Sequence, residues 1–490
     1  MFYKNLLKTK KTKESLFEYD MFKKDQSPND ELLAVCETKN CFNLISGNGA
    51  LKTGYGFKDL TMPQSEENLN DESLFAVQGT ELYRIWKLKW YDQGNDKDIY
   101  NLFFYNDENN MCFDELFGQR HAPFVWESSF SEVPYITHFR NEKQDAVLMS
   151  GKNGIMELVT STGRSVKEDM PAIVSCCIHY GKLFAITAEA RGTLVYSDSL
   201  DIINWTDTAT KDLDFNDERG DLNKIISFND YVYLFRDFGI TKLSVYGNNE
   251  DFAVSHIYKA DGYIYPETIV EYGDNVYFLE GNRLRVFNGL TVKDVPLNCL
   301  EYLKGCDNRN ANAECFEGKY FLACRGDFND GQKIGCENQQ YTNNLLIIYD
   351  IASKQTDVLR GVDIKELLAL TNHLKSKLVA IFYNENKARI GELIQNNSFF
   401  EQPLSSMWKS GKTNFDKPGE RKQIKSFIIK SDYNCKVCFS SEEGEKIYDV
   451  QGKDEVQEIQ TKAFGKLFDV KICVAEGESA NISNFVVRVA

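Results

Sequence analysis

The chain has 490 residues, which is too long for one ordinary domain and long enough for roughly two to four. Hydrophobic residues make up 42% of it and charged residues 27%, a composition that excludes an intrinsically disordered protein. The net charge of −16 argues against a protein that holds nucleic acid by neutralising phosphates. It fits a channel surface over which DNA slides, and it equally fits a protein whose charge only prevents precipitation.

The first part of the chain, residues 1–30, is polar and rich in lysine. It contains no continuous apolar stretch of the kind found in a secretory signal, so we expect a protein that folds in a cytosol with its 13 cysteines reduced. No apolar stretch of the chain approaches the roughly 20 residues that span a bilayer. The early lysines fit a solvated tail, and an arm that touches an acidic partner surface or DNA is the alternative. These lysines are Lys4, Lys8, Lys10, Lys11 and Lys13.

A hairpin is predicted next, within residues 32–57, because Gly47-Asn48-Gly49 lies between two apolar segments. We expect residues 1–78 to form an N-terminal arm and this hairpin. The strands of the hairpin are expected to help close the ring of repeats that follows.

Residues 79–395 repeat one pattern, a short apolar or aromatic strand core that several times follows a hairpin turn. The cores are 101–105 (NLFFY), 145–149 (DAVLM), 182–186 (KLFAI), 231–235 (YVYLF), 275–279 (NVYFL), 319–323 (KYFLA) and 377–381 (KLVAI). Their first residues are 44, 37, 49, 44, 44 and 58 positions apart. Apolar residues alternate by two in these segments, which argues against a helical repeat of similar length. Several hairpin strands in each such period are typical of a propeller blade.

The pattern therefore predicts an all-β protein with a β-propeller of about seven blades, and six or eight would also fit. The longest interval contains residues 326–344 (GDFNDGQKIGCENQQYTNN), a polar insertion that we expect to be an exposed loop.

After residue 395 the repeated pattern ends and a different arrangement of strands and loops is predicted. A Pro418-Gly419 loop and short alternating strands such as 468–474 predict a small C-terminal β-sandwich over residues 396–490.

Three stretches of this chain carry a family resemblance. They are 40–57 (NCFNLISGNGALKTGYGF), 196–205 (YSDSLDIINW) and 408–429 (WKSGKTNFDKPGERKQIKSFII). The first resembles the opening hairpin of bacteriophage virion β-propeller proteins of the tail or neck, of the nozzle, hub or ring type. The second is similar to a recurrent blade strand of those proteins, and the third to their terminal β-sandwich. The resemblance implies a structural protein that assembles as a symmetric oligomer around the DNA channel.

Motifs of catalytic sites are incomplete in this chain. Ser197-Asp198 with Trp205 resembles the Asp-box turn of sialidase propellers, but that turn is structural, and it occurs once here instead of once in each blade. A sialidase also needs an arginine cluster and a Tyr–Glu pair, whose assembly one sequence does not reveal. The chain has five histidines without close spacing, and it has neither a Walker-type loop nor a dinucleotide-binding glycine motif before a helix. The histidines are His121, His138, His179, His256 and His373.

Metal-binding patterns are equally incomplete. Cys435 and Cys438 have the spacing of half a zinc site, but they lie on an alternating strand, where residues three apart point to opposite faces. A group of cysteines with irregular spacing is expected to be buried thiols in strands. These are Cys299, Cys306, Cys315, Cys324 and Cys336. An acidic loop fits a solvated surface, with a Ca²⁺ site as the alternative. It contains Asp201, Asp207, Asp212, Asp214, Asp217 and Glu218.

We therefore expect a non-enzymatic phage virion structural protein, made in the cytoplasm of the host bacterium, with no catalytic, cofactor-binding or metal site. Its expected partners are other copies of itself in a ring and neighbouring tail or neck proteins, with transient passage of DNA and no membrane segment. The alternative is a carbohydrate-binding or sialidase-like propeller that attaches to a host glycan. A cytosolic scaffold of the WD-repeat type is a third option, although its Gly-His and Trp-Asp markers are missing.

Overall fold

The computed structural model describes residues 17–21, 38–47, 49–59, 82–92, 97–106, 111–116, 124–127, 134–140, 145–160, 163–205, 210–245, 252–297, 299–328, 331–338, 343–371, 376–384, 387–416 and 418–490. These residues form strands and a few single-turn 3-10 helices. The chain divides into two compact units, one of residues 56–394 with 398–402, the other of residues 1–55, 395–397 and 403–490. Within the described ranges, no helix is long and apolar enough to cross a membrane.

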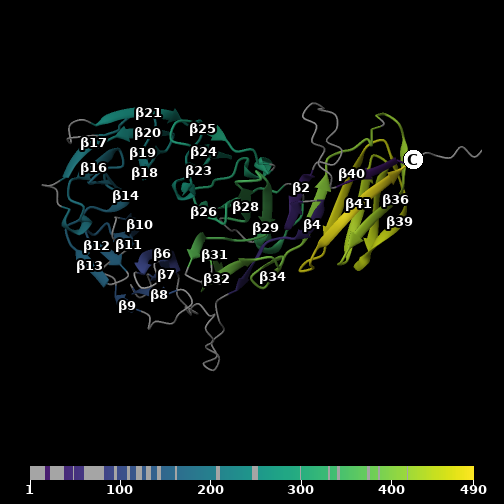
Figure 1. The fold of residues 1–490 in the computed structure, drawn as a ribbon, viewed down its shortest axis with the longest axis horizontal. Helices are drawn as coiled ribbons and strands as arrows, with labels where there is room; N and C mark the ends of the chain where they lie inside the picture. Colours follow the sequence, from purple (N-terminus) through teal and green to yellow (C-terminus); the bar gives the residue numbers. More distant parts are fainter. Residues whose placement is uncertain are drawn as a thin grey trace, which may run out of the picture. The chain divides into compact units, whose positions relative to one another are not determined.

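The first unit is a β-propeller, and its described strands form seven antiparallel sheets that follow one another along the chain and surround a centre (Figure 1). Blades 1 and 2 contain β6 (Leu82–Asp92), β7 (Lys97–Asn106), β8 (Met111–Leu116) and β9 (Phe124–Glu127), then β10 (Tyr135–Arg140), β11 (Asp145–Ser150), β12 (Met156–Thr160) and β13 (Gly163–Lys167). Blades 3 and 4 contain β14 (Ile173–His179), β15 (Lys182–Thr187), β16 (Thr193–Ser197) and β17 (Thr210–Asp214), then β18 (Leu222–Phe228), β19 (Tyr231–Arg236), β20 (Gly239–Ser244) and β21 (Ala253–Lys259). The predicted fold and blade number are confirmed.

The remaining blades have the same order of strands. Blades 5 and 6 contain β22 (Val270–Tyr272), β23 (Asn275–Glu280), β24 (Arg283–Phe287) and β25 (Val292–Asp294), then β26 (Asn312–Phe316), β27 (Lys319–Cys324), β28 (Leu345–Asp350) and β29 (Thr356–Arg360). Blade 7 contains β30 (Glu366–Thr371), β31 (Ser376–Asn384), β32 (Lys387–Ile394) and β5 (Gly56–Asp59), followed by the short β33 (Ser398–Phe399) and β34 (Gln402–Pro403). The described 3-10 helices are η1 (Ile202–Asn204), η2 (Pro266–Thr268), η3 (Leu300–Leu303) and η4 (Gly335–Asn338).

The second strand of each blade contains one of the predicted strand cores. Four of these strands, β15, β19, β23 and β27, are described along their whole length and are buried almost throughout, and in the last three only the first residue is partly exposed. A second strand has a strand on each side within its own sheet and a neighbouring blade against each face. It therefore needs apolar residues on both faces, which explains why these segments read as continuous apolar runs.

Hydrophobic clusters join successive blades. Phe184 of blade 3 and Leu234 of blade 4 belong to one cluster. The next residue of β19, Phe235, belongs to the cluster shared with blade 5, where its ring centroid lies 5.5 Å from that of Phe278. Successive residues of a strand point to opposite faces, so one strand packs against both neighbouring blades.

The ring closes between blade 7 and blade 1. β5 pairs antiparallel with β32, with Phe57 opposite Leu393, so a strand from the N-terminal part of the chain forms the fourth strand of the last blade. β30 of blade 7 in turn contacts β6 and β7 of blade 1. The closing strand therefore lies just after the predicted hairpin.

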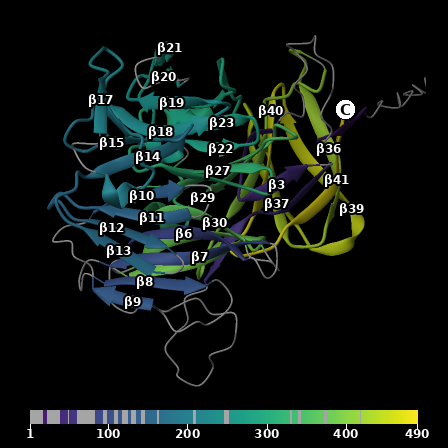
Figure 2. The same ribbon diagram turned by 60° about the vertical axis from the view of Figure 1, so that its left-hand side comes forward.

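The second unit is a β-sandwich. One sheet contains β3 (Leu44–Gly47), β4 (Ala50–Thr53), β41 (Asn481–Val489), β36 (Lys422–Ser431) and β39 (Lys453–Gly465), with β1 (Phe17–Asp20) also on β41 (Figure 2). The other contains β2 (Thr38–Phe42), β35 (Ser406–Ser410), β40 (Phe468–Val474), β37 (Cys435–Ser441) and β38 (Gly444–Val450). Both sheets contribute to one core, and the predicted alternation of β40 buries Val470 and Ile472 completely.

The structure divides the chain differently from the three consecutive segments 1–78, 79–395 and 396–490. The predicted hairpin exists as β3 and β4, but β4 pairs with β41 and β2 pairs with β35. Leu44 and Leu51 of the hairpin are each 1% exposed in the sandwich core. The hairpin completes the sandwich because its apolar face is buried there. The propeller is thus inserted between the N-terminal and C-terminal strands of the sandwich.

Candidate functional site

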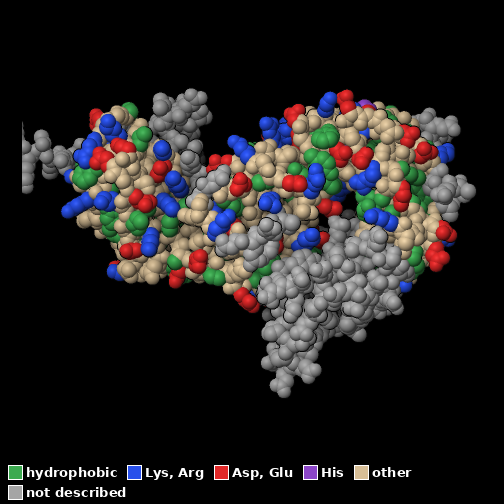
Figure 3. Space-filling view, turned by 180° about the vertical axis from the view of Figure 1, so that it is seen from behind, with side chains coloured by type: hydrophobic (Ala, Val, Ile, Leu, Met, Phe, Trp, Pro, Cys, Tyr) green, Lys and Arg blue, Asp and Glu red, His purple; other side chains and the backbone are tan. Residues whose placement is uncertain are grey.

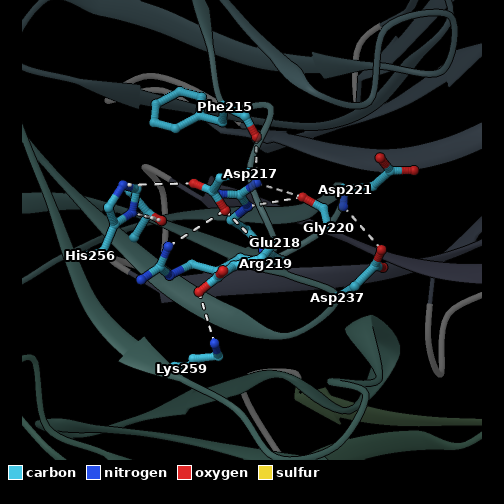
Figure 4. A network of polar contacts seen from close by, with 11 residues as sticks. Phe215, Asp217, Glu218, Arg219, Gly220, Asp221, Asp237, His256 and Lys259 are labelled. Atoms are coloured by element: carbon cyan, nitrogen blue, oxygen red, sulfur yellow. Dashed lines mark hydrogen bonds and ion pairs between the residues drawn. The ribbon is translucent and has the colours of Figure 1, made fainter.

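A network of charged residues surrounds residues 215–221, which lead from β17 to β18 (Figure 4). The loop contains Asp217 and Glu218, two of the acidic residues considered as Ca²⁺ ligands. The residues that contact it come from the end of β19 and from β21. The network therefore joins the loop between blades 3 and 4 to two strands of blade 4, β19 and β21.

Arg236 is the centre of this network. It ends β19 and is completely buried. Its Nη1 donates to Asp217 Oδ2 at 2.8 Å, and its Nε and Nη2 donate to the carbonyl oxygen of Gly220 at 3.0 and 2.7 Å. Nη2 also donates to the carbonyl oxygen of Phe215. The guanidinium thus ties the two ends of the loop together, and these acceptors are what allow a charged group to be buried.

Asp217 is held as an anion. Its Oδ1 accepts the backbone N–H of Arg219 at 2.8 Å, in addition to the bond from Arg236. Partial burial acts to raise the pKa of Asp217, but the Arg219 N–H and the Arg236 side chain outweigh it and leave the pKa below its usual value. A carboxylate in this state is a poor proton donor near neutral pH, which argues against a general-acid role.

Basic and polar side chains from blade 4 cover the outer side of the loop. Lys259 Nζ lies 2.8 Å from Glu218 Oε1, and this bond lowers the pKa of Glu218. His256 Nε2 lies 3.7 Å from Asp217 Oδ2, while its Nδ1 lies 3.0 Å from the hydroxyl of Thr241. The acidic residues of the loop therefore already face positive or donor groups.

A second carboxylate continues the network toward blade 3. Asp237 accepts from Asn223 Nδ2 at 2.7 Å and from the backbone N–H of Asp221 at 3.0 Å. Arg191 Nη2 donates to Asn223 Oδ1 at 2.6 Å. Gly220 has a φ of +76°, and a Cβ on it would lie 2.5 Å from Asp237 Oδ2. A side chain at this turn would be strained and would also displace Asp237.

The positions of the acidic residues argue against a Ca²⁺ site. Asp201 accepts the Ile203 N–H at 3.1 Å as the cap of η1, and Asp214 accepts the Thr193 hydroxyl at 2.8 Å. Asp212 is exposed on β17, and Asp207 lies outside the described residues. Across the described ranges, no group of three or more His, Cys, Asp or Glu is placed to hold a metal ion. Calcium binding requires several oxygens that converge on one point, whereas these oxygens accept from separate donors.

Blade 5 buries a charged side chain at the position equivalent to Arg236. Glu280 ends β23 and is 3% exposed. Its Oε2 accepts from Arg285 Nε at 3.0 Å and from the Tyr258 hydroxyl at 2.6 Å, and its Oε1 accepts the Asp261 N–H at 3.1 Å. This carboxylate anchors β24 and the chain that enters blade 5, so its role is also structural.

The structure of blade 6 contradicts the expectation of an exposed loop in its long insertion. Residues 326–344 were expected to be an exposed loop, but Ile334 and Cys336 are 1% and 0% exposed and Glu337 is buried as well. Glu337, in η4, supplies the negative charge opposite the buried Arg360 at the end of β29. The ring of Phe328 lies 4.1 Å from the Arg360 guanidinium carbon. A buried arginine needs such partners, so the insertion folds onto its own blade.

The clustered cysteines show no arrangement for catalysis. Burial raises the pKa of Cys299 and of Cys336 to about 12, which leaves neither thiol nucleophilic near neutral pH. The prediction of buried thiols in strands is correct for Cys324 only. Cys315 lies in β26 but is half-buried, Cys306 is half-buried outside a strand, and Cys299 and Cys336 are buried outside strands.

The remaining predicted motifs have structural roles within their own strands and turns. Cys435 is part of the sandwich core, whereas Cys438 Sγ lies 2.7 Å from Glu445 Oε1 on the other face of the same sheet. Neither Cys435 nor Cys438 forms a disulfide. In the Asp-box-like turn, Ser197 Oγ accepts the Ser199 N–H at 3.0 Å, and Trp205 is 3% exposed in the core between blades 2 and 3.

The two histidines whose side chains the structure describes belong to different blades. His179 and His256 lie in blades 3 and 4, and the side chains of the other three lie outside the described part. Sequence reasoning missed Arg236 and Glu280. The available signal was a charged residue directly after an apolar strand core, as in YVYLFR and NVYFLE. That position ends a buried strand, where a charge must find a partner.

No protein-family model matches this chain, and no curated protein matches it. Among solved structures, one described as BBS1N in complex with ARL6DN, soaked with lead, has a TM-score of 0.39 and 9% sequence identity, and the match covers 61% of this chain and 87% of that chain. The corresponding crystal soaked with mercury has a TM-score of 0.38 and 9% identity, with 62% and 90% covered. These values are too low to carry an inference about function.

Proposed function

We propose that this chain is a non-enzymatic structural protein of a bacteriophage virion, a tail or neck component that assembles with other copies into a symmetric ring around the DNA channel. The observation that carries the proposal is the pairing of β2 with β35, which places Cys41 opposite Trp408. Two of the stretches with the family resemblance, residues 408–429 and all of 40–57 except Gly56 and Phe57, thus belong to one sandwich. Their joint occurrence in one module supports the resemblance more than either stretch does alone.

The chemistry of the described residues supports a role in assembly. The buried charges, such as Arg236, Glu280 and Arg360, all hold loops or strands. On the face in Figure 3, basic and acidic side chains are interspersed over the described residues. Such a mixed surface favours contacts with other proteins over continuous binding to phosphates.

One observation keeps the glycan-binding alternative as a second candidate. Burial and the carboxylate of Asp237 raise the pKa of Tyr263, and Arg191 and Arg309 lie close enough to oppose that shift. Arginine, carboxylate and aromatic side chains that converge are typical of a site for acidic sugars. However, Arg191 and Asp237 are both bonded to Asn223, which reduces their availability to a ligand.

Electron microscopy of the purified full chain tests the proposal. We expect ring-shaped particles at high protein concentration, and we expect antibodies against the chain to label the tail or neck of virions. A protein that stays monomeric at all concentrations and is absent from purified virions would contradict the proposal. A glycan array with the same preparation tests the second candidate, which predicts selective binding of acidic glycans.

A further inference from the structure

The turns between the first and second strands of blades 3 to 6 lie at one end of the propeller and touch their neighbours. The Tyr180 hydroxyl of blade 3 donates to Asp230 Oδ1 of blade 4 at 3.3 Å. A Cβ on Gly318 of blade 6 would lie 3.6 Å from the Tyr272 hydroxyl of blade 5. Each of these two pairs of neighbouring turns is in contact, and we call the four turns together the hairpin rim.

The hairpin rim exposes aromatic rings together with carboxylates. Tyr180 and Tyr272 are 57% and 39% exposed. The exposed acidic residues at its turns are Asp230, Glu271, Asp274 and Glu317. Aromatic side chains of this kind are enriched in protein interfaces.

Two lysines that follow these turns form ion pairs with carboxylates outside the turns. Lys182 forms an ion pair with Asp198, and Lys319 Nζ lies 3.8 Å from Asp350 Oδ2. Both partners are near the outer strands of their blades. Among the described residues at these turns, the rim therefore has a negative and aromatic character.

His179 packs against the first of these tyrosines. It precedes Tyr180 and is 7% exposed, and its ring centroid lies 4.4 Å from that of Tyr180. Its Nδ1 lies 2.8 Å from Ser227 Oγ, and a hydrogen bond with the backbone of Asp230 opposes the lowering of its pKa by burial.

We propose that the hairpin rim binds the lysine-rich residues 1–16 of a second copy of this chain. This inference rests on the proposed ring assembly and names one of its contacts. The segment combines positive charge with apolar side chains, so it complements a surface of carboxylates and tyrosine rings. Its lysines and apolar residues are Lys4, Lys8, Lys10, Lys11, Lys13, Phe2, Tyr3, Leu6 and Leu7.

Chain length permits this contact between copies. The segment precedes β1, which pairs with β41 and is further fixed by the bond from the Tyr19 hydroxyl to the Phe415 carbonyl at 2.7 Å. Sixteen extended residues span at most about 55 Å. A contact between the N-terminal segment of one copy and the rim of the next uses two different surfaces, and such a contact closes a ring when it is repeated by rotation.

Charge reversal in the full chain tests the inference. One variant carries Lys8→Glu, Lys10→Glu and Lys11→Glu, and another carries Asp230→Lys and Glu317→Lys. Analytical ultracentrifugation over a range of concentrations is expected to show that each variant weakens self-association at least about tenfold, because each leaves like charges opposed. Combining both sets of changes in one chain is expected to restore association, because the charges are complementary again.

A matched control variant carries Asp212→Lys and Glu301→Lys, two exposed positions away from the rim. It makes the same change in net charge as the rim variant and is expected to leave association unchanged. Thermal unfolding of each variant verifies that it is folded.

Three results would overturn the inference. Self-association that both charge-reversed variants retain would show that another surface holds the ring, while the proposed assembly would stand. If the lysine changes weaken binding to duplex DNA but leave self-association unchanged, the segment binds DNA and not the rim. If the N-terminal segment contacts the rim to the same extent at every protein concentration, the two bind within one copy of the chain. Absence of any association in the wild-type chain would instead contradict the proposed function itself.

Discussion

Arg360 and Glu337 form a buried ion pair with two hydrogen bonds, from Nε to Oε1 at 2.6 Å and from Nη2 to Oε2 at 3.0 Å. The side chains are 0% and 2% exposed. Glu337 Oε2 also accepts the Ile334 N–H at 3.1 Å, and Arg360 Nη2 donates to the Gln332 carbonyl at 3.2 Å. The pair therefore joins the end of β29 to the inserted segment of blade 6. Removal of either partner would leave an uncompensated charge without access to water.

Replacement of Arg360 by Met is expected to lower the free energy of unfolding by about 3–5 kcal/mol, because the Glu337 carboxylate stays buried without its partner. Urea unfolding measures the change. The double variant Arg360→Met with Glu337→Leu is expected to recover much of the loss, since no buried charge then remains.

An exposed ion pair is the matched control. Arg421 Nε lies 2.6 Å from Glu443 Oε1, but the two side chains are 58% and 37% exposed. The Arg421→Met variant is expected to lose much less stability than Arg360→Met, because water solvates the carboxylate that remains. Equal losses at Arg360 and Arg421 would contradict the structural importance of the buried pair.

Replacement of Arg236 by Met is expected to release the loop 215–220. The loop loses the donors to Asp217, Phe215 and Gly220, so its backbone N–H groups should exchange faster with deuterium than in the wild-type chain. Hydrogen exchange with mass spectrometry measures this, and the change should be confined to the loop and the adjoining ends of β17 and β18.

Asp217→Asn is the control for Arg236. An asparagine side chain still accepts a hydrogen bond from Arg236, so the loop should stay protected and the free energy of unfolding should fall by only about 1 kcal/mol. A larger effect of Asp217→Asn than of Arg236→Met would show that the negative charge, and not the guanidinium, organises the loop.

Much of the propeller was predictable from the sequence because its second strands carry an unambiguous signal. Residues 231–235 and 275–279 are apolar on both faces, since each lies between two blades, and the structure places them in β19 and β23. The first and fourth strands of a blade are shorter or more polar, so their sequences predict a strand less clearly. An example is β22 (Val270–Tyr272), which has two exposed residues.

The domain division was not predictable, because it depends on pairing between distant residues. β4 pairs with β41 through Leu51 and Ile482, and nothing in either segment identifies the other. The polar network was missed for a similar reason. Arg236 and Asp217 are both charged residues next to turns, and their pairing arises only when the end of β19 meets the loop before β18.

Gly391 is expected to be required for closure of the ring. A Cβ on this residue of β32 would lie 2.7 Å from the Phe400 ring and 3.0 Å from Phe57 Cβ. Gly391→Ala therefore forces the buried Phe57 of β5 or Phe400 to move, and it should destabilise the protein by about 1–3 kcal/mol. Hydrogen exchange should increase in β5 as well.

Gly305→Ala provides the comparison for Gly391. Gly305 has a φ of +73° and a Cβ on it would meet no atom within 4 Å, so that variant has only the cost of a left-handed backbone, about 1 kcal/mol. It should leave exchange in β5 unchanged. Protection of β5 that is the same in Gly391→Ala as in the wild-type chain would contradict the packing described for the closing strand.

The stability of the propeller is expected to fall as the pH rises, in part through Asp363. This carboxyl group is 8% exposed, and burial raises its pKa to about 7, although the Asn343 N–H and Lys365 oppose the shift. In the unfolded chain the pKa returns to about 4. Between these values the folded state holds a proton that the unfolded state has released, so the free energy of unfolding decreases from about pH 4 to about pH 7.

Asp363→Asn removes this titration. The variant should match the wild-type chain near pH 4 and should be more stable by about 2–4 kcal/mol above pH 7, where the wild-type chain must bury a charged carboxylate or bind a proton. Urea unfolding at several pH values measures the difference. Asp212→Asn, an exposed position, should leave the pH profile unchanged. Parallel profiles for the wild-type and Asp363→Asn chains would show that Asp363 is already ionised and solvated in the folded protein, because only a carboxyl group whose pKa differs between the two states gives stability this pH dependence.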